Sequence, residues 1–315
     1  MSESTTSDCH RSRPRPKGPQ PRHALSYHTN PDYQIVALVN RSTPRCLPPE
    51  LAGYNLFQTF EEALALKPDL ISICTHVDTH AQYAIAAMED GANVFVEKPL
   101  AGSLEDAQRV IEVARRTGRK LVVGYILRHH PSWREFIARA RELGPPFVLR
   151  MNLNQQSRGA AWEVHKKLME GSSPMVDCGV HYIDVMLQIT DSRPVQVRGM
   201  GVRLTYFVKD VMGPRGSVSI VGEEAEAGSS ADVDGHTKTS RLKIHRVEKA
   251  KDQVLSMVDE PGHQELCDLE QQFVLDAVRG DYDLSKHWAD ALRSQAVVLA
   301  ADQSMRHKRA IDLDL

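Results

Sequence analysis

The chain has 315 residues and a formal net charge of −2, with 41% hydrophobic and 25% charged residues. At about 100–200 residues per domain, this length predicts two domains. The composition is that of an ordinary globular protein and excludes a collagen, a coiled coil and a wholly disordered chain. No apolar run approaches the ~18 residues of a membrane helix, and the balanced charge leaves no overall footprint for nucleic acid. We therefore expect neither a membrane nor a nucleic acid as partner.

Cysteine usage and the first residues indicate the compartment. The five cysteines are scattered, with no CxxC pair: Cys9, Cys46, Cys74, Cys178 and Cys267. This pattern excludes a disulfide framework and a zinc knuckle, and it predicts a reducing compartment, the cytosol. Residues 1–22 lack the apolar segment of a signal peptide, and we expect a disordered basic arm there. A mitochondrial presequence, which the prolines disfavour, and nucleic-acid binding through the arm's five cations remain alternatives.

Residues 23–126 alternate short apolar runs with amphipathic segments. The runs predict buried strands at Gln34–Asn40, Asp69–Cys74, Asn93–Val96 and Lys120–Gly124. Helices are predicted between them, at Phe60–Leu66, His80–Asp90 and Leu104–Arg116. A capping box at Thr59-x-x-Glu62 and glycines at 91 and 118 support their ends. This alternation is typical of a parallel, doubly wound α/β sheet.

Residues 127–315 follow a different pattern, with strands in succession flanked by helices, which predicts an α+β domain. The predicted helices are Trp133–Glu142, Val176–Ile189, His263–Arg279 and Lys286–Met305. The predicted strands are Phe147–Leu153, Val195–Leu204, Phe207–Val211, Ser217–Val221 and Arg241–Val247. The acidic, Gly/Ser-rich segment Glu223–Lys238 is predicted to be a loop.

Ligands of an open parallel sheet bind beyond the carboxyl ends of its strands. Three polar segments follow predicted strands: Asn40-Arg41-Ser42, Thr75–His80 and Glu97-Lys98-Pro99. His76 and His80 have the spacing of a metal pair, but no third ligand accompanies them, so we predict no metal and expect His80 to pack at a helix start. A lysine at a buried strand end suits proton chemistry, because desolvation shifts its pKa readily. Pro99 permits a cis peptide bond.

A second candidate constellation lies in the predicted helix Val176–Ile189. Asp177 and His181 are four residues apart and share a helix face. A carboxylate beside an imidazole fixes its tautomer and raises its basicity, and Asp184 is a second candidate for that role. The alternative is an aspartate at a helix start and a histidine buried in the core.

Together these segments resemble the Gfo/Idh/MocA family, named for glucose–fructose oxidoreductase and inositol dehydrogenase. Glu97-Lys98-Pro99 is similar to its EKP signature, and Thr75…His80 to its TPxxxH segment, with His76 in place of proline. The GYxxRxxP and DxGxHxxD signatures are matched by two sets of residues: Gly124, Tyr125, Arg128 and Pro131, and Asp177, Gly179, His181 and Asp184. The resemblance runs from about residue 23 to the C-terminus.

The resemblance implies a Rossmann-like dinucleotide-binding domain (23–126), a substrate and oligomerisation domain (127–315) and a homo-oligomer. It implies hydride transfer between NAD(P) and a sugar, cyclitol or related alcohol or ketone. By motif, Lys98 and His181 act at the reacting carbon, with His181 as general acid/base and Asp177 orienting it or the substrate. Cofactor-binding residues would be Asn40, Arg41, Ser42, Thr75, His80, Glu97, Lys98 and Pro99. Substrate-binding residues would be Arg128, Trp162, His165 and Asp184.

Cofactor preference follows from the segment at residues 40–42. NAD-selective sites place an acidic residue here for the ribose 2′-hydroxyl. Asn40-Arg41-Ser42 has a cation instead, which favours the 2′-phosphate of NADP over NAD. The alternative is that Arg41 is a solvated loop residue.

Two departures from the family pattern affect both fold and function. No apolar strand and no GxGxxG loop precede His23, and the chain's GxG, at Gly199–Gly201, lies in the second domain. The region Leu204–Val211 is also compressed. We therefore predict an N-terminally truncated Rossmann-like parallel sheet followed by an α+β domain with an open, shortened β-sheet. Three functions stay open: an oxidoreductase of the family type, a non-catalytic relative that has lost cofactor binding, and a tailoring reductase of secondary metabolism.

Overall fold

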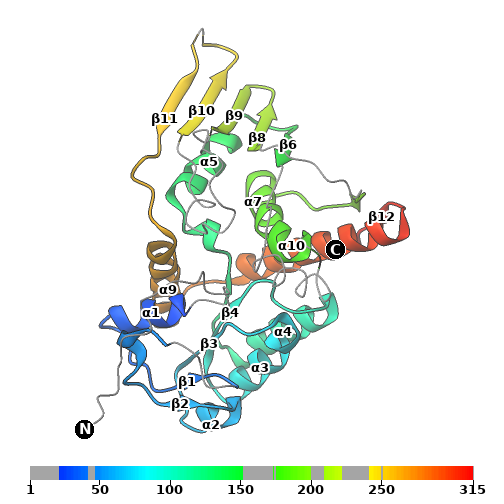
Figure 1. Cartoon of the computed structure of the whole chain (residues 1–315). Coiled ribbons are helices and arrows are strands. Elements are labelled where there is room, and N and C mark those ends of the chain that lie inside the picture. Colours follow the sequence, from blue (N-terminus) through cyan, green and yellow to red (C-terminus); the bar gives the residue numbers. More distant parts are fainter. Residues whose placement is uncertain are drawn as a thin grey trace, which may run out of the picture.

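The computed structural model describes residues 21–41, 47–151, 173, 175–199, 209–221, 241–249 and 251–314. Figure 1 shows a parallel sheet with its helices in the lower half and an antiparallel sheet at the top, with the C-terminal helix α10 between them. Among these residues Cys74, Cys178 and Cys267 are free thiols. Cys9 and Cys46 lie outside the described part of the chain.

The parallel sheet has the order β3-β4-β5, with strands at Leu70–Ile73, Asn93–Glu97 and Leu121–Gly124. Val94 pairs with Ile71 on one side and Leu121 on the other. Helices α3 (Val77–Glu89) and α4 (Leu104–Thr117) pack against each other beside it. The three predicted strands and both helices are confirmed to within three residues at each end. Gly118 ends α4 in the left-handed conformation, which glycine adopts without steric cost.

The predicted strand Gln34–Asn40 is wrong in extent. Only Leu38–Val39 (β1) pairs, in parallel with Leu56–Phe57 (β2), and the two strands form a separate sheet. The short helix α2 (Phe60–Leu64) follows, with its predicted capping box formed. A complete doubly wound sheet begins with a strand that precedes the first helix. That strand lies in the middle of the sheet, between the two strands that correspond here to β1 and β3. No strand precedes α1 (Arg22–Thr29) within the described residues. The parallel strands accordingly form two sheets, β1-β2 and β3-β4-β5, separated where the sequence predicted a missing strand.

The antiparallel sheet forms the second core. Its order is β11-β10-β9-β8-β6, with strands at Gln253–Ser256, Arg241–Arg246, Gly216–Val221, Lys209–Gly213 and Val148–Met151. Apolar side chains from one face of it pack with helix α5 (Pro131–Arg141) and helix α7 (Val180–Thr190). The sequence predicted β6, β8, β9 and β10 but missed β11. A short pair, β7 (Gln196–Val197) with β12 (Ile311–Asp312), lies near the end of the chain.

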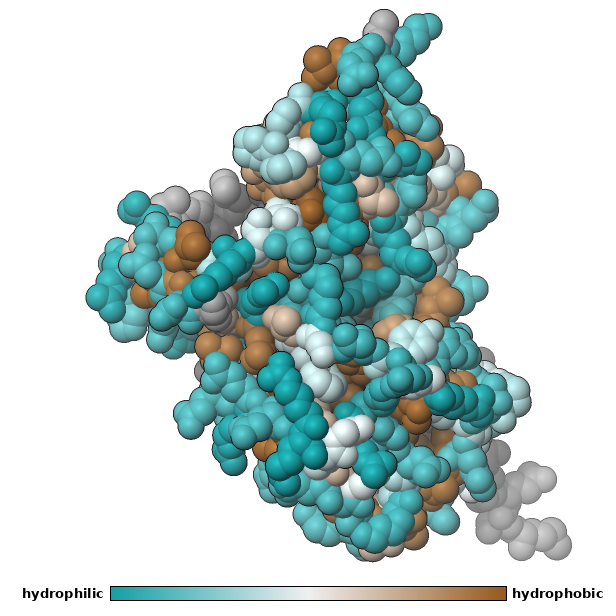
Figure 2. Space-filling view, turned by 180° about the vertical axis from the view of Figure 1, so that it is seen from behind, coloured by the Kyte–Doolittle hydropathy of each residue, from teal (hydrophilic) through white to brown (hydrophobic). Residues whose placement is uncertain are grey.

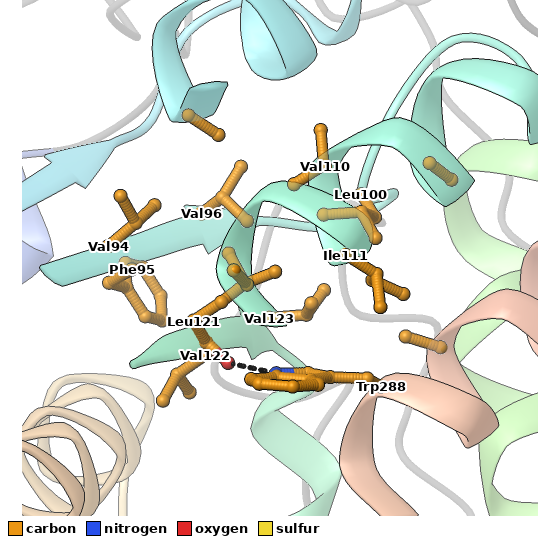
Figure 3. Close-up of a cluster of buried hydrophobic side chains, with 14 of the residues drawn as sticks. Val94, Phe95, Val96, Leu100, Val110, Ile111, Leu121, Val122, Val123 and Trp288 are labelled. Atoms are coloured by element: carbon orange, nitrogen blue, oxygen red, sulfur yellow. Dashed lines mark hydrogen bonds between the residues drawn. The ribbon is translucent and has the colours of Figure 1, made fainter. Parts of the chain in front are cut away.

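The last two helices return to the first core. Helix α9 (His263–Arg279) packs on α1, and α10 (Ser285–His307) packs on α4, β5 and α7. On α10, Trp288 Nε1 donates to the carbonyl of Leu121 at 2.8 Å (Figure 3), and His287 Nε2 accepts from the amide of Val123 at 2.9 Å. The sequence placed both helices in the second domain, and some of their buried side chains, among them Val274, Trp288 and Val298, pack in the core of the parallel sheet.

In Figure 2, apolar side chains on the visible face are interspersed among polar ones. Within the described residues, no helix combines the length and hydropathy required to cross a membrane.

Candidate active site

Lys98 follows directly on the last residue of β4, and the Lys98–Pro99 bond is cis, as the sequence allowed. Its Nζ donates to the carboxylate of Asp177 at 2.7 Å and to the carbonyl of the same residue at 2.8 Å. The lysine side chain is 17% exposed. Burial lowers its pKa, but the acidic groups around it, Asp177 first, then Cys178 and Glu97, together outweigh burial and raise the pKa above its ordinary value. Lys98 is therefore a fixed ammonium group at the carboxyl edge of the sheet.

Asp177 lies in a π turn, η4 (Met175–Gly179), which leads into α7. The sequence predicted a regular α-helix from Val176, and this local expectation is wrong. Burial raises the pKa of Asp177, but Lys98 more than offsets this and holds it below its usual range. The Asp177 carbonyl in this turn accepts from Lys98, and π turns of this kind are frequent at functional sites.

His181 is on the first turn of α7, edge-on to Tyr125 with the ring centres 6.2 Å apart. Its Nδ1 is buried and has no hydrogen-bond partner among the described residues. Burial, and next the charge of Lys98, lower the pKa of His181 to about 3. The ring is therefore neutral near pH 7 and can accept a proton. The predicted hydrogen bond from this ring to Asp177 or Asp184 is not formed, since Asp177 accepts from Lys98 and Asp184 accepts from Arg128.

A hydrogen-bonded chain that the sequence did not predict supports Glu97. Glu97 Oε1 accepts from His23 Nε2 at 2.8 Å, and His23 Nδ1 accepts from the Gln271 amide at 2.9 Å. Burial raises the pKa of Glu97, but the hydrogen bond from His23 and the favourable electrostatic surroundings, which include the Lys98 ammonium, together outweigh burial and lower it well below its usual value. Gly124 opposes Glu97 in the register, and a Cβ there would lie 3.3 Å from Glu97 Oε2. The glycine thus leaves room for an ionised carboxylate beside Lys98.

His80 is buried and joins two loops at the same edge of the sheet. Its Nδ1 lies 2.8 Å from the carbonyl of Pro99, and its Nε2 lies 3.1 Å from the carbonyl of Thr75. Burial lowers the pKa of His80 despite these two acceptors. A neutral ring carries one N–H, so it donates to one carbonyl at a time. The prediction that His80 packs near a helix start is confirmed, although α3 begins three residues earlier, at Val77.

Arg128 and Asp184, both predicted to contact substrate, bind each other instead. Arg128 Nε lies 2.9 Å from Asp184 Oδ2, and its Nη2 donates to Asp184 Oδ1 and, at 3.1 Å, to Oδ2 of Asp290. The side chains of both aspartates are 1% exposed. Because the carboxylate of Asp184 binds a buried guanidinium, we expect Arg128 and Asp184 to support the site from behind and not to contact the substrate.

The remaining predicted residues are only partly placed. Asn40 and Arg41 follow β1, where the amide of Asn40 donates to the carbonyl of Phe57 at 3.0 Å and Arg41 is exposed. Ser42, Trp162 and His165 lie outside the described residues, as does the predicted loop Glu223–Lys238. No group of three or more metal-ligating side chains occurs among the residues that the structure describes.

A nicotinamide cofactor, which the motifs imply, fits the carboxyl edge of β4. The unpartnered Nδ1 of His181 and the ammonium of Lys98 give that edge a proton acceptor and a cation. The first turn of α1 also has no side-chain cap, and uncapped amides of this kind favour a phosphate. These residues would hold the nicotinamide ribose and part of the pyrophosphate.

Comparison with known proteins agrees with this arrangement. A model described as "Oxidoreductase family, NAD-binding Rossmann fold" matches residues 18–125, and the "GFO/IDH/MocA C-terminal domain" matches residues 134–226. D-glucoside 3-dehydrogenase of Escherichia coli (strain K12) is 27% identical over 177 residues, which are 53% of this chain and 49% of that protein. The scyllo-inositol 2-dehydrogenase (NAD(+)) of Bacillus subtilis (strain 168) is 27% identical over 168 residues, 53% of this chain and 48% of the relative. The matches thus span about half the length of these curated relatives.

Solved structures share the fold over most of the chain. The WlbA dehydrogenase from Bordetella pertussis, solved with NADH and UDP-GlcNAcA, superposes with a TM-score of 0.70 at 17% identity, over 93% of this chain and 94% of that chain. An oxidoreductase domain protein from Kribbella flavida gives a TM-score of 0.70 at 18% identity, over 93% and 96%. At this identity the likeness establishes the fold, and the two family models, which together match more than half of the residues, establish the ancestry. The chain belongs to the Gfo/Idh/MocA oxidoreductase family.

Proposed function

We propose that this protein is an NAD(P)-dependent oxidoreductase that transfers a hydride between nicotinamide and a secondary alcohol of a sugar or cyclitol, or the corresponding ketone. The observation that carries the proposal is the contact of Lys98 with Asp177 at the carboxyl edge of the parallel sheet, with His181 four residues after Asp177 on the first turn of α7. The two dehydrogenases named above, acting on a glucoside and on scyllo-inositol, support the substrate class. A cytosolic location and a homo-oligomer stay predictions from the sequence.

The residues of the chain divide the work between position and proton transfer. Lys98, held by Asp177, donates to the substrate oxygen and stabilises negative charge that develops there. His181 takes the hydroxyl proton during oxidation and returns it during reduction, which is the role that its motif implies. Glu97 remains ionised and keeps the local field favourable to the ammonium. When bound, the nicotinamide supplies the hydride acceptor or donor, and this is the only chemistry required of it.

Substitution of the two central side chains tests the proposal. Lys98→Met and His181→Asn are each expected to lower kcat by at least about 10²-fold, since each removes a group in contact with the reacting atoms. The assay follows nicotinamide absorbance with a panel of sugars and cyclitols. Lys243→Met and His28→Asn, both at exposed positions, serve as matched controls and should keep the wild-type rate. Wild-type turnover in either Lys98→Met or His181→Asn contradicts the assignment.

A non-catalytic relative is the second candidate, and the division of the parallel sheet between β1 and β3 favours it. Titration of the folded chain with NADPH and NADH, followed by nicotinamide fluorescence, separates the two candidates. Micromolar binding supports the oxidoreductase. No binding at millimolar cofactor supports the non-catalytic relative.

A further inference from the structure

Arg128 is the centre of a buried ionic cluster behind the proposed active site. Its side chain is 16% exposed and faces two carboxylates, Asp184 and Asp290, each with a side chain that is 1% exposed. Both aspartates bind its guanidinium directly, as described above. Gln188 adds a third donor, from its Nε2 to Asp184 Oδ2 at 2.9 Å. The family motifs contain Arg128 and Asp184 but not Asp290, which lies 106 residues beyond Asp184 in the sequence.

The three charged residues come from the three elements that must be held together. Arg128 lies on the short helix η3 (Ile126–Arg128), which directly follows β5 and links the first core to the second. Asp184 lies on α7, three residues after His181, so the two residues are neighbours on that helix. Asp290 lies on α10, which packs against β5, α4, α7 and η4. One guanidinium therefore connects the sheet that carries Lys98 with the helix that carries His181.

The charge balance of the cluster depends on α10. Asp290 Oδ1 accepts no hydrogen bond among the described residues, but Lys286 Nζ lies 3.5 Å and Arg293 Nη1 3.8 Å from it. Both cations are on α10 and reach solvent. Asp290 thus lies between the buried Arg128 and two cations near the surface. Burying such a cluster costs desolvation energy and adds little stability over an apolar core. A guanidinium that binds two carboxylates from two other elements restricts how those elements can be arranged.

We propose that Asp290 is a positioning residue, which orients Arg128 and, through Asp184, fixes α7 so that His181 faces Lys98. The inference rests on the proposed function, because it gives the C-terminal helix a part in the same reaction. Asp290 contacts neither Lys98 nor His181 in the structure, so it acts through Arg128. Misplacing a catalytic group by about 1 Å can lower the rate about 10²-fold, and the effect belongs to kcat.

The test compares Asp290→Asn with Asp302→Asn. Asp302 is on the same helix, in an exposed pair with Arg306 at 2.8 Å, and the chemical change is identical. Asp290→Asn is expected to lower kcat about 10–100-fold while the KM for the cofactor stays within about twofold. Asp290→Glu keeps the charge and is expected to recover part of the loss. Asp302→Asn should leave both parameters unchanged.

A second measurement does not depend on catalysis. Hydrogen–deuterium exchange of the peptide over residues 175–190 should be faster in Asp290→Asn than in wild type and unchanged in Asp302→Asn. Unchanged exchange over this segment, or a kcat equal to that of wild type, overturns the positioning role. If the wild-type chain transfers no hydride, the proposed function fails, and the exchange measurement alone then decides whether Asp290 holds α7. Thermal unfolding of each variant separates a local shift from a loss of the fold.

Discussion

Glu270, on α9, is a buried carboxyl group with no hydrogen-bond partner for either oxygen among the described residues. Burial first, and the charge of Glu97 second, raise its pKa well above the ordinary value of 4.5. Above pH 4.5 the unfolded chain releases this proton while the folded chain retains it. The contribution of Glu270 to the free energy of unfolding is therefore greatest below pH 4.5. It decreases as the pH rises toward the pKa of the folded state, by up to about 1.4 kcal/mol per pH unit.

Glu270→Gln is expected to stabilise the protein at pH 8 and to remove this loss, since the amide cannot ionise. Urea unfolding at pH 5, 6.5 and 8 measures the effect. Glu248→Gln, at an exposed position, is the control and should leave the pH dependence intact. Equal slopes for Glu270→Gln and wild type would show that Glu270 is ionised in the folded protein.

Arg41, exposed just beyond β1, is the residue on which the predicted preference for NADP rests. Arg41→Ala is expected to raise the Kd for NADPH about 10- to 100-fold, because a charge-assisted hydrogen bond to the 2′-phosphate contributes ~1.5–3 kcal/mol. The Kd for NADH should change less than twofold. The fluorescence titration measures both constants, and a parallel change in the two would mean that Arg41 lies in a solvated loop.

For single residues of the site, the sequence predicted those that belong to short motifs. It missed those that hold the motif residues in place from distant parts of the chain. Lys98, Asp177 and His181 are in recognisable spacings, and the structure brings the first two into contact. His23 and Gln271 reach Glu97 across long sequence separations, so no local pattern could pair them. In the sequence, Glu270 is recognisable only as a charged residue at a core-facing position of an amphipathic helix. Its surroundings could not be predicted, because tertiary packing determines them.

Among the secondary-structure elements, α10 gains stability from an interaction with strand β5. Trp288→Phe keeps most of the buried ring but removes the donor to the carbonyl of Leu121. Because that carbonyl would remain buried without its partner, the free energy of unfolding should fall by about 1–3 kcal/mol. Chemical denaturation measures it, with the half-exposed Tyr282→Phe as the control. A change below about 0.5 kcal/mol would mean that a water molecule replaces the indole.

The elements themselves were predicted where a local signal defines them. The capping box at Thr59 and the glycine at 118 mark real helix ends. The π turn before α7 has no such signal, since its residues fit an α-helical pattern equally well. Strand β1 was predicted too long because an apolar run needs partners to become a strand, and among the described residues β1 has a neighbour on one side alone.

For the molecule as a whole, four histidines with a lowered pKa contribute to the response to acid. Desolvation lowers the pKa of His181 to about 3 and of His129 to about 4, and it lowers the pKa values of His80 and His287 below 6.5. Below pH 6.5 the unfolded chain binds protons at these positions while the folded chain does not. Unfolding is therefore increasingly favoured as the pH falls from 6.5 toward 4, by up to about 1.4 kcal/mol per pH unit for each histidine.

His129→Phe should reduce the slope of the free energy of unfolding against pH in this range by the contribution of one proton. The ring contact with Phe273, at 5.1 Å, can persist without a titrating group. Urea midpoints between pH 4.5 and 7 give the slope. Replacing the exposed His28 with asparagine should leave it unchanged. If His129→Phe has the same slope as wild type, His129 titrates in the folded state.

The two-domain outline was predictable from the change of pattern near residue 126, where the buried residues divide between two cores. The return of α9 and α10 to the first core was not predictable from the pattern. An amphipathic helix specifies that one face is covered, but it does not specify which sheet covers it.

The contact of α10 with β5 also determines how this protein resists aggregation. An exposed strand edge is a template from which intermolecular sheets grow. At the free edge of β5, His287 accepts and Trp288 donates as the backbone of an added strand would. This edge is thus blocked by side chains that lie more than 160 residues further along the chain. A nascent chain that has not yet received its last helix therefore exposes a template that the finished protein lacks.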